Sequence, residues 1–210
     1  MTARDEILKS AREALGGGDV QPEATPAARI RIPEVALEAR IASLFRAVCA
    51  LAGKTFLAGS PADAQAYVAA LIGSGPAVAS NAAVLRECGI ADLAGVQTGF
   101  TDLQELRQAC ASAPFGITSA DYALADTGTL VMLSSPQEAR MISLLPPVHI
   151  AVVPRSRILS GLDELLSLVP RPGEISSSMV LITGPSRTAD IEQILVRGVH
   201  GPGEIHVLVS

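Results

Sequence analysis

The stretch TFLAGSPADAQAYVAALIGSGPAVAS, residues 55–80, decides the fold class. It opens with a short apolar run at Thr55–Ala58, continues with a helical pattern over Ala62–Ile72, and ends with a second apolar run at Ala77–Ser80. Short apolar runs that alternate with amphipathic helices are typical of buried parallel strands. The stretch therefore predicts strand, helix and strand in a parallel sheet that is covered on both faces.

The same alternation extends along the chain in both directions. On the N-terminal side a helix is predicted over Glu34–Ala52; on the C-terminal side follow a helix over Ala82–Cys88, a strand near Val96, and a helix from a Thr101/Gln104 capping pair to Cys110. Further strands are predicted at Thr129–Ser134, His149–Val153, Met179–Thr183 and Ile205–Val209, with a helical turn at Ala120–Ala125 and helices at Leu162–Val169 and Ala189–Val196. With about eight strands, the chain is predicted to be an α/β protein with one core.

The first 33 residues are predicted to be an arm outside the domain of residues 34–210. Thr2 and Asp5 resemble a helix cap, and the apolar residues up to Leu15 share one face of a short helix that ends at three glycines. The proline-rich segment Asp19–Pro33 is then predicted to be an extended linker. The arm is therefore a candidate contact for a neighbouring subunit or a partner protein.

Composition excludes several classes of function. The net charge is −5 and aromatic residues make up 3% with no Trp, which argues against a nucleic-acid partner. No apolar run has the length of a membrane span, and the acidic start differs from a signal peptide, so we expect a cytoplasmic protein without membrane contact. Cys49, Cys88 and Cys110 have no metal-ligand spacing, and we expect all three to be reduced and buried.

The segment GPSRTADI, residues 184–191, is predicted to bind an anion. It follows an apolar strand and precedes a helix, which is where open parallel sheets bind ligands. Backbone N–H groups at the helix start would converge on a carboxylate or phosphate together with two hydroxyls and a guanidinium, and Asp190 would cap the helix or orient the arginine. The candidate contacts here are Gly184, Ser186, Arg187 and Thr188. The alternative is an ordinary turn in which Thr188 only caps the helix and Arg187 is solvated.

A second polar turn, Asp126-Thr127-Gly128-Thr129, lies between two apolar runs. Gly128 would let the backbone approach a ligand, Thr127 and Thr129 would face it, and Asp126 is the acid best placed for proton transfer. The alternative is a glycine turn before a strand, with Asp126 satisfying backbone N–H groups. Neither turn matches a Walker loop or a dinucleotide fingerprint.

Two further side chains, Arg140 and His200, complete the candidate set. Arg140 precedes an apolar stretch and is a second candidate anion ligand, or else a surface arginine. His200 lies in a turn that would come near the Arg187 loop, whereas a histidine at a strand start, such as His149, is more often structural. The histidine spacing gives no metal motif, and the serines give no nucleophile elbow.

Several stretches together resemble the LUD-domain family. They are GITSADYALADTGTL at 116–130, RMISLLPPVH at 140–149, TGPSRTADIE at 183–192 and GVHGP at 198–202. The resemblance spans about Ala113–Val209, and the motifs occur in the family's order. In such sequences the acid before Thr-Gly-Thr is often Glu, and it is the shorter Asp126 here, which argues against covalent coenzyme A transfer.

The resemblance implies a three-layer α/β/α sandwich like that of phosphosugar isomerases and coenzyme A transferases. It also implies a role in oxidising L-lactate to pyruvate beside partner proteins that carry iron-sulfur clusters, with no cofactor in this chain. The chain would then bind a small carboxylate or phosphate, as a possible subunit of an L-lactate-oxidising complex. Two alternatives stay open: a non-catalytic assembly or regulatory subunit that docks through its N-terminal arm, and a transferase or isomerase acting on a phosphorylated or coenzyme A substrate.

Overall fold

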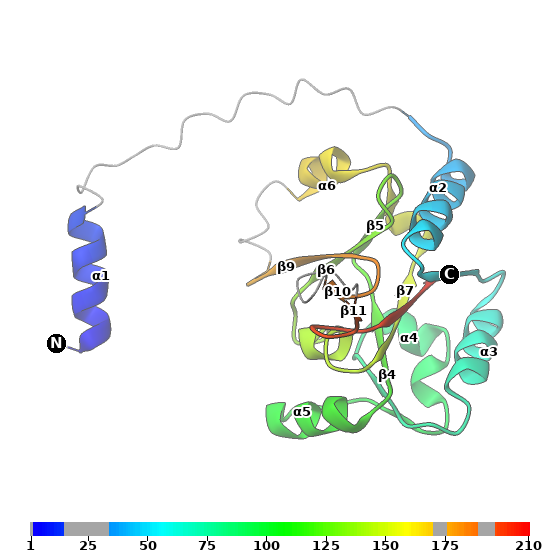
Figure 1. The fold of residues 1–210 in the computed structure, drawn as a ribbon, viewed down its shortest axis with the longest axis horizontal. Coiled ribbons are helices and arrows are strands. Elements are labelled where there is room, and N and C mark those ends of the chain that lie inside the picture. Colours follow the sequence, from blue (N-terminus) through cyan, green and yellow to red (C-terminus); the bar gives the residue numbers. More distant parts are fainter. Residues whose placement is uncertain (1, 15–33, 170–175, 189–195) are drawn as a thin grey trace. The chain divides into compact units, whose positions relative to one another are not determined.

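The computed structural model describes residues 2–14, 34–169, 176–188 and 196–210, which fall into two compact units, Met1–Arg31 and Ile32–Ser210. In the first unit, helix α1 (Ala3–Ala14) is capped as predicted: Asp5 Oδ2 accepts hydrogen bonds from Thr2 N and Thr2 Oγ1 at 2.8 and 2.7 Å (Figure 1). No residue of α1 is buried. The predicted linker Asp19–Pro33 lies outside the described residues.

The second unit is built on a six-stranded sheet in which every neighbouring pair of strands is parallel. Its strand order is β1-β12-β7-β4-β2-β3. The strands are β1 (Lys54–Leu57), β2 (Ala77–Ala79), β3 (Val96–Gln97), β4 (Phe115–Ser119), β7 (Val148–Val153) and β12 (Glu204–Val209). The α/β class and the parallel sheet predicted from the sequence are confirmed.

The two faces of this sheet bury different partners, as the alternation along β7 shows. Ile150 and Val152 lie in a core cluster with α3 (Pro61–Ile72), α4 (Ala83–Glu87) and the short helix η1 (Ile90–Asp92) (Figure 1). Ala151 and Val153 point to the opposite face, where α2 (Leu37–Ala50) packs. Nearby on that second face, α5 (Leu103–Ser112) and η2 (Arg140–Ser143) form a smaller cluster around Val78.

A second sheet of four strands, in the order β8-β5-β6-β9, also packs on the α2 side. Its strands are β5 (Tyr122–Leu124), β6 (Thr129–Leu133), β8 (Ile158–Leu159) and β9 (Met179–Thr183), and α6 (Leu162–Leu168) packs against it. The short helix η3 (Arg155–Arg157) leads into β8. The helical turn predicted at Ala120–Ala125 is wrong, because Tyr122–Leu124 form strand β5. Ala120, Ala123 and Ala125 are buried in the core cluster that also contains α2.

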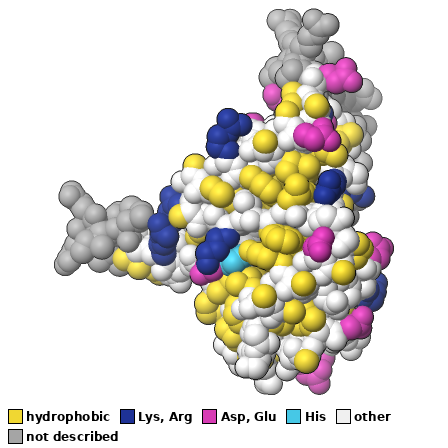
Figure 2. Space-filling model, turned by 90° about the vertical axis from the view of Figure 1, so that its right-hand side faces the viewer, with side chains coloured by type: hydrophobic (Ala, Val, Ile, Leu, Met, Phe, Trp, Pro, Cys, Tyr) yellow, Lys and Arg dark blue, Asp and Glu magenta, His cyan; other side chains and the backbone are white. Residues whose placement is uncertain are grey.

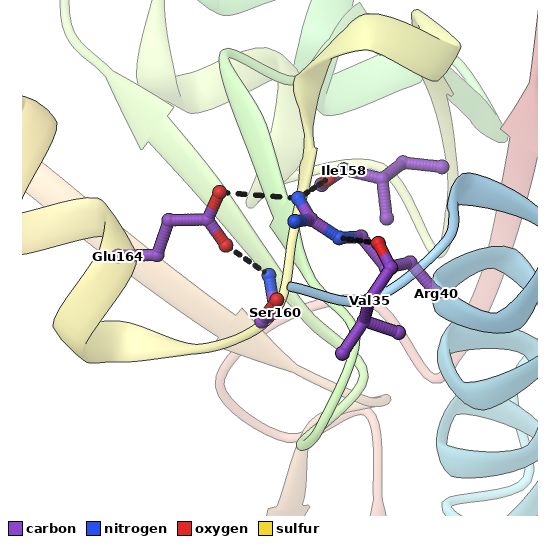
Figure 3. A network of polar contacts seen from close by, with 5 residues as sticks. All are labelled: Val35, Arg40, Ile158, Ser160 and Glu164. Atoms are coloured by element: carbon purple, nitrogen blue, oxygen red, sulfur yellow. Dashed lines mark hydrogen bonds and ion pairs between the residues drawn. The ribbon is translucent and has the colours of Figure 1, made fainter. Parts of the chain in front are cut away.

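A polar cluster joins α2 to this second sheet (Figure 3). Arg40 donates from Nε to the Val35 carbonyl at 3.0 Å and from Nη1 to the Ile158 carbonyl at 3.2 Å, and Nη1 lies 3.1 Å from Glu164 Oε1. The other oxygen of Glu164 accepts from Ser160 N at 2.7 Å. Both charged side chains are 19% exposed, so the pair is largely shielded from water.

Two local predictions need correction. The N-cap of α5 is Asp102 rather than Thr101: its Oδ1 accepts hydrogen bonds from Gln104 N and Glu105 N, both at 2.9 Å. Cys49 is exposed, whereas the other two cysteines are buried as expected. The hydroxyl of Thr55 lies 3.7 Å from the Cys49 sulfur, which sits at the end of α2 where the helix leaves the core.

Apolar side chains also reach the surface. Figure 2 shows them gathered in patches on one face, with Lys and Arg side chains beside them. Exposed large apolar residues include Leu144, Leu145 and Val199, which are 40%, 48% and 51% exposed. Of the helices that the structure describes, none is long and apolar enough to cross a membrane.

Candidate functional site

The Asp126–Thr129 turn connects β5 to β6 and carries a chain of hydroxyl contacts. Thr127 Oγ1 donates to Asp126 Oδ1 at 3.2 Å and lies 2.7 Å from Thr129 Oγ1. Thr129 Oγ1 lies 2.8 Å from Thr183 Oγ1 across the β6–β9 ladder. Asp126 and Thr127 are exposed, and Thr129 is buried. The chain therefore links the solvent-facing carboxylate to the end of β9, just before the second candidate loop.

Gly128 approaches a helix rather than open space for a ligand. Its φ is +69°, and a Cβ atom there would lie 2.8 Å from Val48 N and 2.9 Å from the carbonyl carbon of Ala47. Both atoms belong to the last turns of α2. The sequence-based prediction was a close approach to a ligand at Gly128; the structure places the α2 backbone there.

The loop after β9 follows an antiparallel strand, whereas the sequence predicted a strand of the parallel sheet. β9 lies in the second sheet and runs antiparallel to β6, so the rule for the carboxyl ends of parallel strands does not apply to it. Arg187–Thr188 form β10, which pairs antiparallel with β11 (Val196–Arg197). The predicted helix Ala189–Val196 is wrong at Val196; residues 189–195, Asp190 included, lie outside the described residues.

Arg187 and Gly184 pack against the C-terminus of α2. Arg187 is exposed, and its Nη2 donates to the carbonyl of Leu51, the C-cap residue of α2. A guanidinium there satisfies a free carbonyl and opposes the negative end of the helix dipole. Gly184 has φ +77°, and a Cβ atom on it would lie 2.9 Å from Leu51 Cβ. The two candidate segments thus meet at one place, the end of α2.

Ser186 joins this loop to the turn that contains His200. Ser186 N donates to the Pro202 carbonyl at 2.8 Å, and Gly198 N donates to the Ser186 carbonyl at 3.0 Å. His200 therefore does lie in a turn that contacts the Arg187 loop. The pairing of β10 with β11 also sets Arg187 opposite Arg197, a cation that the sequence interpretation missed.

An open groove of about 690 Å³ runs along this turn. One wall is the apolar connection between η2 and β7, and the other is the end of β11 with the turn that follows it. The lining residues are Leu144, Leu145, Pro147, Arg197, Gly198, Val199, His200, Gly201 and Gly203. Pro147 and Gly203 directly precede β7 and β12, so the groove lies at the amino end of the parallel sheet.

The groove offers hydrogen-bond donors with no acceptor among the described residues. Both Arg197 and His200 are exposed. The backbone N–H groups of Val199, His200 and Gly201 donate to no backbone carbonyl in the described part of the chain. Consecutive free N–H groups beside a guanidinium form an anion-binding concavity. The sequence-based prediction placed Arg187 at the anion; in the structure Arg187 contacts the Leu51 carbonyl, and Arg197 is the arginine that lines the groove.

Arg140 lies away from the Thr129–Thr183 pair. Its Nη1 donates to Ser178 Oγ at 3.2 Å, next to the Leu133–Met179 end of the β6–β9 ladder. The Thr129–Thr183 pair is at the other end, four residues away, which is about 13 Å along a strand. Arg140 therefore does not share the Thr129 cluster.

The sequence interpretation also missed Glu138, a buried carboxyl group. Glu138 is 7% exposed, and its Oε1 accepts from Ser80 Oγ, Ser119 N and Ser119 Oγ at 2.9, 2.9 and 2.6 Å. Burial raises its pKa, and the serine hydrogen bonds offset part of that effect. The sequence feature that could have pointed to Glu138's partners is a serine directly after β2, Ser80, and another at the end of β4, Ser119. These two strands are neighbours, so their ends place both hydroxyls at one edge of the sheet.

Two buried histidines make hydrogen-bond contacts with other side chains of the domain. His149 is fully buried, its Nε2 lies 2.8 Å from Thr118 Oγ1, and burial lowers its pKa to about 4. His206 lies 2.7 Å from both Tyr67 Oη and Glu204 Oε1, and burial lowers its pKa as well. No group of three or more His, Cys, Asp or Glu side chains within the described residues is arranged to hold a metal ion.

The LUD-domain family model matches residues 41–210, which is most of the chain and includes both candidate segments. This chain belongs to the LUD-domain family. The LUD domain thus covers the parallel sheet, the second sheet and the groove.

Similar proteins carry a name that refers to lactate. "Lactate utilization protein C" of Halalkalibacterium halodurans is 42% identical over 106 residues, covering 49% of this chain and 46% of that protein. The protein of the same name from Anoxybacillus flavithermus is 33% identical over 144 residues, covering 67% of this chain and 65% of that protein. The aligned part of the LUD chain thus spans about half to two thirds of the length of these relatives.

A solved structure shows the same fold. The DUF162 family protein of Deinococcus radiodurans aligns with a TM-score of 0.63 over 84% of this chain and 99% of that chain. The two sequences are 19% identical, so the likeness supports the fold of the LUD domain alone.

Proposed function

We propose that this LUD-domain protein is a component of a lactate-utilisation system, in which it binds a small carboxylate or a related anion. The groove beside β11 is the observation that carries the proposal. It combines one guanidinium, one imidazole and an apolar wall with three backbone N–H groups that donate to no backbone carbonyl of the described residues, and these donors can hold a carboxylate while the wall contacts carbon. The names of the relatives supply the lactate context.

Within this proposal Arg197 and the residues predicted from the sequence have different roles. Arg197 and His200 contact the anion, and Ser186 and Gly201 hold the turn that presents the N–H groups. Arg187, Gly184 and Gly128 fix the loop and the β5–β6 turn against the end of α2. Asp126 is the proposed acid of the neighbouring polar chain, with Thr127 and Thr129 as its hydrogen-bonded partners. The redox step would take place in partner proteins that carry iron-sulfur clusters.

Calorimetric titration with lactate, pyruvate and phosphate tests the groove. Arg197→Gln removes a charge-assisted hydrogen bond and should weaken binding of the preferred anion by about tenfold or more. The matched control is Arg107→Gln, which removes an exposed arginine from α5, away from the residues that line the groove. Equal affinity of wild type and the Arg197 variant, or no binding of any of these anions to wild type, would exclude the groove as the anion site.

A second candidate function is assembly, and helix α1 favours it. Ile7 and Leu8 on the helix are 69% and 41% exposed, and no residue of α1 is buried. An amphipathic helix with an unburied apolar face can dock on a partner protein. Under this reading, Ile7→Asp with Leu8→Asp abolishes co-purification with cluster-bearing partners and leaves anion binding unchanged, whereas intact co-purification contradicts it.

A further inference from the structure

Three neighbouring strands of the parallel sheet end beside an open cavity of about 440 Å³. The strands are β1, β12 and β7, and the residues that directly follow them, Ala58, Ser210 and Pro154, all line the cavity. On one side of β12 the chain leaves β1 toward α3, which packs on the face with Ile150 and Val152. On its other side the chain leaves β7 toward β8, on the opposite face. Open α/β sheets bind ligands at carboxyl ends where the connections diverge in this way.

Arg155 brings a guanidinium to the wall of this cavity. It is half-buried and held in place at both ends: its backbone N donates to the Ser210 carbonyl at 2.9 Å, and its Nη2 donates to the Ala58 carbonyl at 2.6 Å. Its Nε and Nη1 have no hydrogen-bond acceptor among the described residues, and no described Asp or Glu side chain forms an ion pair with it. A fixed guanidinium with unused donors suits a carboxylate, which accepts two parallel N–H bonds.

The same cavity also carries negative charge. Glu87, the last residue of α4, lines it and is exposed, and it forms no ion pair with Arg155 or with any other cation of the described residues. A second acid, Asp63, lies beside the cavity-lining Gly59, whose N donates to its Oδ2 at 3.1 Å. A ligand with only a negative charge would meet these acids, and a ligand with only a positive charge would meet Arg155. A ligand that carries both charges matches the cavity.

The remaining walls of the cavity are mostly apolar. Pro61, Val84 and Pro154 line it, and the Cys88 side chain, which is buried, lines it too. The hydroxyl of Ser60 is already engaged as the N-cap of α3, where it accepts from Asp63 N at 3.2 Å. The carbon skeleton of a ligand can therefore contact these walls while its charged groups face the two charged side chains. The volume lies within the range of about 300–1,000 Å³ that is typical of small-molecule sites.

We infer that this cavity is a second ligand site, which binds a small zwitterion: an amino acid with a short apolar side chain, its carboxylate on Arg155 and its ammonium group on Glu87. Opposite charges that line one cavity without pairing with each other carry the inference. An analogue with one charge leaves the other side chain unmatched, so the pair of charges supplies specificity. The cavity lies at the carboxyl end of the sheet and the groove at its amino end, so the inference does not depend on the proposed function.

Nuclear magnetic resonance on the full chain with three matched probes tests this site. L-Alanine carries both charges, lactate has a hydroxyl in place of the ammonium group, and alaninamide lacks the carboxylate. L-Alanine should shift the amide signals of Gly59, Cys88 and Arg155 saturably, with an affinity about tenfold or more above that of either analogue. Arg155→Gln removes the charge that holds the carboxylate and should weaken L-alanine binding by about tenfold or more. Arg107→Gln, which removes an exposed arginine of α5, should bind as wild type does.

A second variant tests the acid without disturbing a buried contact. Glu87→Gln keeps the shape of an exposed side chain and removes its charge, so it should bind L-alanine no better than lactate at this cavity, whereas the exposed-acid control Glu105→Gln should keep the wild-type preference. Three results would overturn the proposal: no saturable shifts with L-alanine, equal affinities of wild type for L-alanine and lactate at these amides, or an unchanged preference in Glu87→Gln. Shifts of the Val199 and Gly201 amides with lactate report on the groove, so the two sites succeed or fail separately.

Discussion

A single guanidinium ties the C-terminal loop to α2. Replacing Arg187 by Gln removes the hydrogen bond to the Leu51 carbonyl and the favourable charge at the helix end. We expect the free energy of unfolding to fall by about 0.3–1 kcal/mol, with a Tm lower by about 1–4 °C in calorimetry. The Arg107→Gln control should leave the Tm unchanged. A variant that keeps its Tm but loses anion binding would instead place Arg187 in the binding site.

The buried imidazole of His149 makes stability depend on pH. Its pKa is about 4 in the folded chain against 6.5 as the ordinary value, so between these values the unfolded chain binds a proton that the folded chain does not. Stability therefore falls as the pH decreases through this window, by on the order of 3 kcal/mol in total. In His149→Gln, urea unfolding at about pH 7 and about pH 5 should show a smaller loss on acidification.

The control for this pH dependence is His200→Gln, because His200 is exposed whereas His149 is fully buried. That variant should lose as much stability on acidification as wild type does. His206, whose pKa burial also lowers, remains in all three proteins and contributes equally to each. If His149→Gln and wild type lose the same free energy, the buried imidazole is not the titrating group.

At the scale of elements, the contact between α2 and the β5–β6 turn depends on Gly128. Gly128→Ala adds a methyl group 2.8 Å from Val48 N at a positive φ, so the turn must move away from α2. The backbone strain alone costs about 1–3 kcal/mol, and the clash adds to it. Gly99→Ala is the matched control, since Gly99 has φ +79° with no atom within 4 Å of the added Cβ. Chemical unfolding should show the larger loss for Gly128; equal losses would contradict the close packing.

The Arg40–Glu164 pair joins α2 to the second sheet through partly buried charges. Truncating either partner leaves the other with an unmet charge, so Arg40→Met and Glu164→Gln should each destabilise the domain. A double-mutant cycle should give a coupling of about 1 kcal/mol or more, because the two residues touch. The exposed Lys9–Glu13 pair of α1 offers a comparison in which the coupling should be much smaller.

The alternation of helices and strands up to α5 could be predicted from the sequence because each element carries its own period. The second sheet could not, since Ala120–Ala125 is short and alanine-rich and becomes a strand through its burial beside α2. Thr129 and Thr183 bring the two polar turns together across the β6–β9 ladder. The contacts of Gly128 and Arg187 could not be predicted from the sequence, because no local pattern reveals that both residues face the end of α2.

For the whole molecule, the residues from 34 onward should fold without the N-terminal unit. The hydrophobic clusters of the described residues all lie within Ile32–Ser210. A chain that starts at Glu34 should therefore unfold at the same urea concentration and with the same slope as the full chain. A lower midpoint would show that residues 1–33 stabilise the domain.

The last strand, β12, lies between β1 and β7 and pairs with both. During synthesis, β1 leaves the ribosome roughly 150 residues before β12 does, so β1 presents an open edge throughout that interval and β7 presents one from its own synthesis onward. Open apolar edges recruit other chains, and contacts between distant residues form slowly. A chain that stops shortly before Glu204 would have a sheet that is split in two. Quality control by chaperones and proteases should therefore act on chains that lack β12.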